Sequence, residues 1–136
     1  MAEYKKPLPV PNSDNIKFWE GCKKHELLVQ KCKDCDSYRY PPRSICPKCF
    51  SVESTWDKVN GKGEVYTFTV ARVPLNPAWE LDIPYTIGVI QLDEGVRMVS
   101  NIVDCKPEDI KIGMKVEVIF DDVTDNISLP KFKPIN

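Results

Sequence analysis

The stretch Lys31–Phe50, KCKDCDSYRYPPRSICPKCF, decides the fold of the first part of this 136-residue chain. It contains two Cys-x-x-Cys pairs, Cys32/Cys35 and Cys46/Cys49, with ten residues between them. Each pair lets two thiolates converge on one cation. Two such turns that face each other complete a tetrahedral site with four sulfur ligands, the arrangement that structural zinc prefers. The spacing therefore predicts a structural metal site that folds a segment too small to fold alone.

Two other interpretations of the cysteine pairs are open at this point. A redox-active disulfide of the thioredoxin kind needs a pair at the start of a helix that follows a strand, whereas the sequence places both pairs in loops. Rubredoxin holds iron with the same four ligands, so the sequence does not separate iron from zinc. Zinc is favoured because nothing else in the sequence suggests electron transfer. A closed four-cysteine site has no open coordination position, so we expect no catalysis at the metal.

Upstream of the metal-binding stretch, the sequence predicts an arm and a helix over residues 1–30. Residues 1–12 are rich in proline and favour an extended path. Ser13 or Asp14 provides an N-cap for a helix that runs to about Lys24. The apolar stripe of this helix consists of Ile16, Phe18, Trp19 and Cys22. Short strands at 27–31 and 37–40 then lead into and out of the first cysteine pair, which predicts a zinc ribbon over residues 31–60.

The rest of the chain, residues 61–136, has the alternating pattern and turn signals of short β-strands. We expect a helical turn at 107–110 and an edge position for the last strand, since Pro130 lacks an N–H group. Tyr66 and Phe68 alternate with polar residues in the manner of core positions. The five predicted strands are 65–70, 85–92, 96–103, 115–121 and 129–133. Five antiparallel strands with a brief helical turn fit an OB-fold barrel, although a split barrel or a sandwich gives a similar pattern.

The composition excludes several classes of protein. The chain has 19 basic and 20 acidic residues, which disfavours a strongly basic nucleic-acid binder. Its twelve prolines disfavour a helical bundle. Residues 1–49 carry ten Lys/Arg and six Asp/Glu, whereas residues 50–136 carry nine and fourteen, so we expect any anion site in the first part or at the junction. The sequence shows neither a membrane-spanning segment nor a signal peptide, and we expect a cytoplasmic protein without membrane contact.

The order of several motifs resembles a known two-domain family. The motifs are Phe18-Trp19-Glu20, the two cysteine pairs, Tyr40-Pro41-Pro42-Arg43, Gly61-x-Gly63, Leu92-Asp93-Glu94-Gly95 and Gly113. They resemble the family that pairs a rubredoxin-like zinc ribbon with a C-terminal OB-fold, over residues 14–121. Asp36 and Phe50 stand where many such knuckles have glycine, which predicts less tight turns.

The resemblance implies a mainly β fold, a zinc cofactor and a place in acyl-CoA metabolism. Members of this family accompany thiolases and hydroxymethylglutaryl-CoA synthase. In archaeal complexes, a member holds those two enzymes together and contributes to a shared CoA-binding site. The implied function is that of a non-catalytic acyl-CoA-binding scaffold, with acyl-CoA and enzymes of these two types as partners.

Two regions carry the candidate binding residues. Arg43 follows two prolines and precedes the second cysteine pair, so it is a rigid candidate for the phosphates of acyl-CoA, although an ion pair or a stack on Tyr40 explains it equally well. Arg39 and Lys48 are further candidates. The stiff apolar segment 74–84 suits either an interface or a lid over the barrel. In it, Trp79 is a candidate for both acyl-CoA and partner binding, and the other candidate interface residues are Trp19, Leu75 and Leu81.

Two alternative functions compete with that of a scaffold. Zinc ribbons and OB-folds also bind single-stranded nucleic acid, but that function needs a basic groove with stacking aromatic residues, and the barrel part is acidic. An independent enzyme needs a catalytic constellation, and the sequence has no Ser-His-Asp pattern, Cys-His pair or Gly-rich phosphate loop. The single histidine, His25, is expected at the surface.

Overall fold

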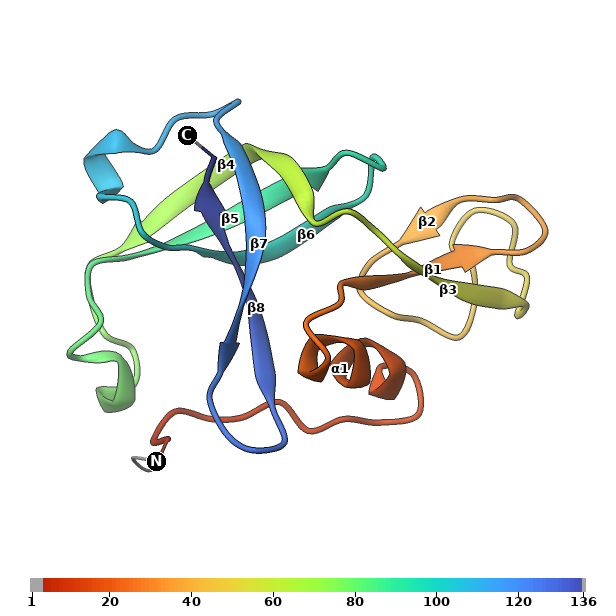
Figure 1. Cartoon of the computed structure of the whole chain (residues 1–136), viewed down its shortest axis with the longest axis horizontal. Helices are drawn as coiled ribbons and strands as arrows, with labels where there is room; N and C mark the ends of the chain where they lie inside the picture. Colours follow the sequence, from red (N-terminus) through yellow and green to blue (C-terminus); the bar gives the residue numbers. More distant parts are fainter. Residues whose placement is uncertain (1–3, 136) are drawn as a thin grey trace.

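The computed structural model describes residues 4–135 and shows a small zinc-ribbon-like sheet beside a closed β-barrel (Figure 1). The prediction of a mainly β chain with one N-terminal helix, a ribbon and a five-stranded OB-fold barrel is confirmed. The helix is α1 (Ile16–Lys23), and the ribbon strands are β1 (Leu28–Cys32), β2 (Tyr38–Arg39) and β3 (Ser54–Lys58). The barrel strands are β4 (Lys62–Ala71), β5 (Tyr85–Leu92), β6 (Arg97–Ile102), β7 (Lys115–Asp122) and β8 (Ser128–Pro134). Short 3₁₀ turns, η1 (Pro77–Trp79) and η2 (Pro107–Asp109), lie between barrel strands.

The ribbon sheet has β1 at its centre, in the order β2-β1-β3. β3 was not predicted as a strand, since its sequence STWDK has little apolar alternation. It forms because β1 offers a full pairing partner, in register from Leu28 opposite Lys58 to Cys32 opposite Ser54. The chain thus returns from the second cysteine pair along the strand that carries the first.

The helix α1 lies between the ribbon and β8 (Figure 1). Its residues Phe18 and Cys22 are buried, and the Phe18 ring contacts Trp19 edge-on at a centroid distance of 5.0 Å. The predicted caps are wrong, because the N-cap is Asn15 and it makes no side-chain capping bond. Asn12 instead closes the preceding turn, where its Oδ1 accepts a hydrogen bond from the N–H of Asp14 at 2.9 Å.

The barrel closes in the order β4-β5-β6-β8-β7, with β4 also paired to β7. Phe132 and Ile90 are fully buried in its core. The predicted edge position of the last strand is wrong, because β8 lies between β7 and β6. Pro130 is tolerated there since β8 pairs with β6 only at Ile102 opposite Phe132, beyond the proline.

The prediction that Tyr66 faces the core is also wrong. The pairing of β4 with β5 shifts register between Val65 and Thr67, which marks a β-bulge at Tyr66. The bulge changes which side chains point inward, so that Val65 is 1% exposed whereas Tyr66 is 46% exposed. Phe68 remains half-buried against the core. The bulge therefore places an aromatic ring on the outer surface of the barrel.

Within residues 4–135, none of the helices has the length and apolar character that a membrane crossing requires.

Candidate functional site

The four cysteines of the two pairs meet in one cluster. Their Sγ atoms all lie within 4.8 Å of one another, with Cys32 and Cys49 at 3.5 Å and Cys35 and Cys46 at 3.6 Å. A tetrahedron with metal–sulfur bonds of about 2.3 Å has sulfur–sulfur edges of about 3.8 Å. A disulfide requires about 2.05 Å. The distances therefore fit four thiolates around one metal ion and do not fit disulfides.

The backbone presents the four sulfur atoms through two knuckles of the same construction. In each, the first cysteine's carbonyl accepts a hydrogen bond from the residue four positions on, and its N–H donates to the carbonyl five positions on. The bonds are Asp36 N to Cys32 O (3.0 Å), Phe50 N to Cys46 O (2.9 Å), Cys32 N to Ser37 O (2.9 Å) and Cys46 N to Ser51 O (2.9 Å). Asp36 and Phe50 adopt the left-handed φ values of 60° and 62° that glycine would favour. The turns are therefore equally tight without glycine.

A groove of about 340 Å³ lies between the ribbon and the barrel, and two of its walls carry arginines. Arg43 comes from the ribbon and is exposed, whereas Arg97 comes from the start of β6. The remaining lining residues are Tyr38, Arg39, Tyr40, Pro47, Gly95 and Val96. The structure thus brings together two of the predicted acyl-CoA residues, Arg39 and Arg43, and adds Arg97.

Arg39 supports the groove from inside the ribbon. It is only 5% exposed, and its Nε and Nη2 donate to the carbonyl of Arg43 at 3.2 and 2.8 Å. The N–H of Arg43 donates to Oε1 of the buried Gln30 at 2.7 Å. These contacts hold the backbone of Arg43 from both sides and leave its side chain free to reach a ligand.

Sequence reasoning missed Arg97. Its guanidinium carbon lies 3.8 Å from the centroid of the exposed Tyr66 ring, and its Nε donates to Gln91 Oε1 at 3.2 Å. Such stacking preorganises a guanidinium group for bidentate binding of a carboxylate or phosphate group. No local motif signals this residue, because its position opposite the ribbon arises from the packing of the two units.

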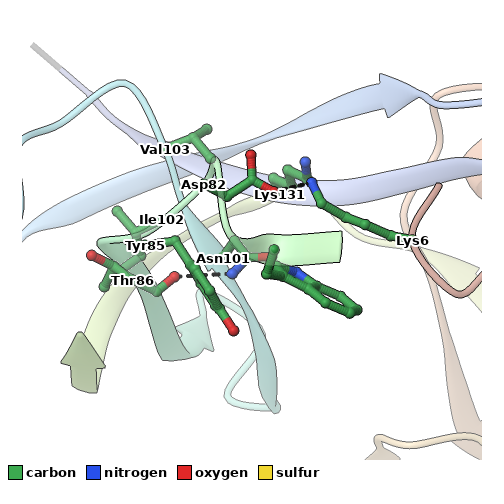
Figure 2. A pocket seen from close by; sticks show the side chains of 9 residues that line it. Lys6, Asp82, Tyr85, Thr86, Asn101, Ile102, Val103 and Lys131 are labelled. Atoms are coloured by element: carbon green, nitrogen blue, oxygen red, sulfur yellow. Dashed lines mark hydrogen bonds and ion pairs between the residues drawn. The ribbon is translucent and has the colours of Figure 1, made fainter. Parts of the chain in front are cut away.

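Two further hollows lie along the same side of the barrel. One, of about 190 Å³, lies between α1 and β6 and is lined by Trp19, Tyr40 and Val99 among others. The next, of about 210 Å³, lies at the far end of β6 and is lined by Trp79 and Tyr85. Figure 2 shows this second hollow, where Lys6 of the N-terminal arm reaches Asp82 to form an ion pair.

The other predicted site residues lie apart from the arginine groove. Trp79 is half-buried in the far hollow, and Leu75 and Leu81, on either side of it, are 98% and 99% exposed. Trp19 is half-buried on α1. Lys48 is exposed beside the second cysteine pair and lines none of these hollows. The predicted acyl-CoA residues therefore do not form one cluster.

Comparisons with known families match both units. The model described as "ChsH2, rubredoxin-like zinc ribbon domain" matches residues 19–53, and "ChsH2, C-terminal OB-fold domain" matches residues 56–121. A DUF35 domain-containing scaffold protein from Methanocaldococcus jannaschii is 41% identical over 128 residues, which cover 88% of this chain and 90% of the relative. The chain belongs to the DUF35 family.

Other proteins similar to this DUF35 chain carry the names of acyl-CoA enzymes or their complexes. A probable enoyl-CoA hydratase alpha subunit from Thermomonospora curvata is 38% identical over 95% of the chain. The chain spans 40% of the length of that subunit. A solved structure of an Ltp2-ChsH2(DUF35) aldolase superposes with a TM-score of 0.84 at 36% identity, covering 93% of this chain and 98% of that one. The names indicate an accessory subunit related to acyl-CoA chemistry.

Proposed function

We propose that this DUF35 chain is a non-catalytic accessory subunit that binds acyl-CoA and docks on a thiolase-type or hydroxymethylglutaryl-CoA synthase-type enzyme in the cytoplasm. The family's scaffold names and the similarity to an enoyl-CoA hydratase subunit and an aldolase complex support the general role. The single observation that carries the docking part is the exposed apolar loop between β4 and β5.

Specific contacts hold the backbone of that loop, although its leucines are exposed. Asn76 Oδ1 accepts a hydrogen bond from the N–H of Ala78 at 2.9 Å, which starts the 3₁₀ turn. The ion pair between Lys6 and Asp82 ties the end of the loop to the N-terminal arm. Leu75 and Leu81 thus project from a fixed frame. Apolar side chains in such a position favour a protein interface, because docking removes them from water without ordering a flexible loop.

The non-catalytic part of the proposal is supported by the surroundings of the candidate nucleophiles and bases. The ring of His25 forms its hydrogen bond with Asp122, at 2.9 Å, rather than with a serine or cysteine. In the part of the chain that the structure describes, four of the cysteines form the metal cluster, and Cys22 is fully buried. We assign the chemistry to the partner enzyme and the positioning of ligand and enzyme to this chain.

We propose zinc as the metal of the four-cysteine site. Cys32, Cys35, Cys46 and Cys49 would hold it, and their thiolates suit either zinc or iron. When bound, the ion cross-links the two knuckles and supplies folding free energy. The four protein sulfur atoms fill a tetrahedral coordination shell, so the site serves structure.

Single-stranded nucleic acid is the competing ligand class. The exposed Tyr66 beneath Arg97 favours it, since stacking aromatic residues next to cations are what such ligands require. The excess of acidic residues over residues 50–136 opposes it, because a nucleic-acid track needs a broad positive surface. We therefore favour a small phosphorylated ligand.

The experiment that tests the proposed function is recovery of the partner. The tagged full chain is purified from a lysate of its source organism, and co-purifying proteins are identified by mass spectrometry after nuclease treatment. We expect a thiolase or a hydroxymethylglutaryl-CoA synthase in near-stoichiometric amount. Recovery of nucleic-acid-dependent partners alone, or acyl-CoA turnover by the isolated chain, would contradict the proposal.

A further inference from the structure

Strand β6 forms one side of the arginine groove and of the two hollows beyond it. The arginine groove is lined by Arg97, the middle hollow by residues 98–101, and the far hollow by residues 101–103, of which the last directly follows β6. Neighbouring hollows also share walls: Tyr40 lines the first two, and Lys131 lines the last two. The three hollows therefore follow one another along a single strand.

Every residue from Arg97 to Val103 lines at least one of the three hollows. Because side chains alternate along a strand, those of Arg97, Val99 and Asn101 share one face. Arg97 and Val99 are exposed on this face, while Met98 and Ile102 point into the core. At about 3.3 Å per residue, the path from Arg97 to Val103 is roughly 20 Å long. This is the dimension of an extended chain molecule rather than of a compact ligand.

One side of β6 lacks a strand neighbour over most of its length. β6 pairs with β5 from Arg97 to Ile102, but its pairing with β8 is confined to Ile102. At Ser100 the hydroxyl donates to the Pro130 carbonyl of β8 at 2.8 Å, so the edge without a strand neighbour is the Arg97–Val99 segment, among the strands that the structure describes. Extended ligands with amide groups bind such edges through the strand's backbone N–H and C=O groups. The aromatic rings of Trp19 and Tyr40 supply the apolar wall opposite.

The arginine end of the path has uncompensated positive charge. Among residues 4–135, no ion pair includes an arginine, so Arg43 and Arg97 have no carboxylate partner. The buried Arg39 also keeps its Nη1 without a hydrogen-bond partner in this part of the chain. A buried guanidinium group without an anion is costly, and a bound anion offsets that cost. Tyr38, which also lines the groove, does have a carboxylate partner, because its hydroxyl donates to Asp57 Oδ2 at 3.1 Å.

The far end of the path reaches the loop between β4 and β5, residues 72–84, which we call the docking loop. Trp79 and Asp82 line the last hollow and belong to the same loop as Leu75 and Leu81. Figure 2 shows Asp82 in this hollow. A ligand that entered at the arginines and followed β6 would therefore end beside the surface that we propose for the enzyme. The charge at one end, the open strand edge and the apolar wall together define one class of ligand: a phosphorylated head with an extended amide-containing arm.

We infer that the groove along β6 is the acyl-CoA site, with the nucleotide phosphates on Arg43 and Arg97, the pantetheine arm along Val99 and Asn101, and the acyl end at Trp79. The inference rests on the proposed function, and it gives the ligand a direction. The acyl group leaves the chain at the docking loop, where the partner enzyme receives it. Arg97 binds phosphate, and Arg39 is a positioning residue that holds Arg43 in place.

Calorimetric titration of the full chain with CoA, dephospho-CoA and pantetheine tests this assignment. We expect Arg97→Gln and Arg43→Gln each to weaken CoA binding at least about tenfold, the loss typical of one charged hydrogen bond, and to leave pantetheine binding unchanged. Val99→Glu should weaken both CoA and pantetheine. Arg72→Gln is the matched control, because Arg72 is exposed and lies outside all three hollows.

The outcomes separate this inference from the proposed function. Equal CoA affinity of the wild-type chain and Arg97→Gln, or no CoA binding by the wild-type chain, would overturn the groove assignment, while recovery of the partner enzyme would still support the accessory role. Loss of the partner with intact, arginine-dependent CoA binding would overturn the accessory role and leave the groove standing. Tighter binding of single-stranded DNA than of CoA, with the same arginine dependence, would assign the groove to nucleic acid instead.

Discussion

His25 and Asp122 join the ribbon side of the molecule to the barrel. His25 Nε2 lies 2.9 Å from Asp122 Oδ1, and the imidazole ring stacks on Phe120 with a centroid distance of 5.2 Å and an interplanar angle of 10°. His25 follows α1 directly and has a φ of 60°. The pair therefore fixes the end of the helix against β7.

The contact predicts a pH dependence of stability that Asp122→Asn removes. The hydrogen bond with His25 lowers the pKa of the Asp122 carboxyl in the folded chain. The pKa of an unfolded aspartate is about 3.9. The stabilisation by this contact is therefore present above that pH and is lost as the pH falls through the lowered pKa of the folded chain. In urea unfolding, the stability difference between the wild-type chain and Asp122→Asn should shrink between pH 7 and pH 3. The same difference at both pH values would contradict this, and Asp125→Asn is the control.

Loss of one metal ligand should unfold the ribbon. In Cys32→Ser or Cys49→Ser, three sulfur ligands remain, and the two knuckles lose the ion that links them. We expect elemental analysis to show stoichiometric zinc in the wild-type chain and loss of the metal in both variants, with circular dichroism reporting reduced order. Cys105→Ser is the control, since Cys105 lies outside the cluster and should keep the metal. Full metal and full stability in a Cys32/Cys49 double variant would refute the site.

The metal site was predictable because its signal is local. Two turns at a fixed spacing determine which four sulfur atoms can meet, and the left-handed φ values at Asp36 and Phe50 show that the turn forms even where glycine is absent. The barrel was predictable from strand periodicity for the same reason. Tyr66 departs from this periodicity, because a bulge depends on the partner strand and leaves no mark in the sequence of β4.

The arginine groove was not predictable, because it belongs to the packing of the two units. Arg39 was predicted as a phosphate ligand, and the structure shows in addition that its guanidinium group donates to the Arg43 carbonyl. Arg97 looked like an ordinary exposed strand residue. The role that we propose for it depends on Tyr66, which the bulge turns outward, and on the ribbon wall that faces it. Neither condition is readable from neighbouring residues.

Gly63→Ala should destabilise the barrel. Gly63 lies opposite Leu92 in β5 and Val116 in β7, and a methyl group there would lie 2.9 Å from the Leu92 Cα and closer still to the Gln91 carbonyl oxygen. Backbone atoms on the neighbouring strand cannot move aside as a flexible side chain would. We expect a loss of about 1–3 kcal/mol in the free energy of unfolding, measured with urea. Thr67→Ala, at an exposed position of the same strand, should cost less than about 1 kcal/mol. Equal losses of unfolding free energy in the two variants would show that the neighbouring strands move apart to accommodate the added methyl group.

Arg39→Lys should destabilise the ribbon although it keeps the charge. The planar guanidinium group donates from both Nε and Nη2 to the Arg43 carbonyl, and an ammonium group cannot reproduce this fork. Since the side chain is buried, we expect a loss of about 1–3 kcal/mol in unfolding free energy. Arg72→Lys, at an exposed position, serves as the control. Unchanged stability of Arg39→Lys would mean that these bonds are replaced by water.

Acidic substitutions in the docking loop should leave the free chain stable and weaken its binding to the partner enzyme. Leu75 and Leu81 are 98% and 99% exposed, so the double variant Leu75→Asp/Leu81→Asp should change the free energy of unfolding by less than about 0.5 kcal/mol. If these leucines are buried by the partner enzyme, its affinity should fall at least about tenfold in a quantitative pull-down. Val52→Asp, at a ribbon position that is 67% exposed, is the matched control and should retain the partner. Retention of the partner by the double variant would place the docking surface elsewhere on the molecule.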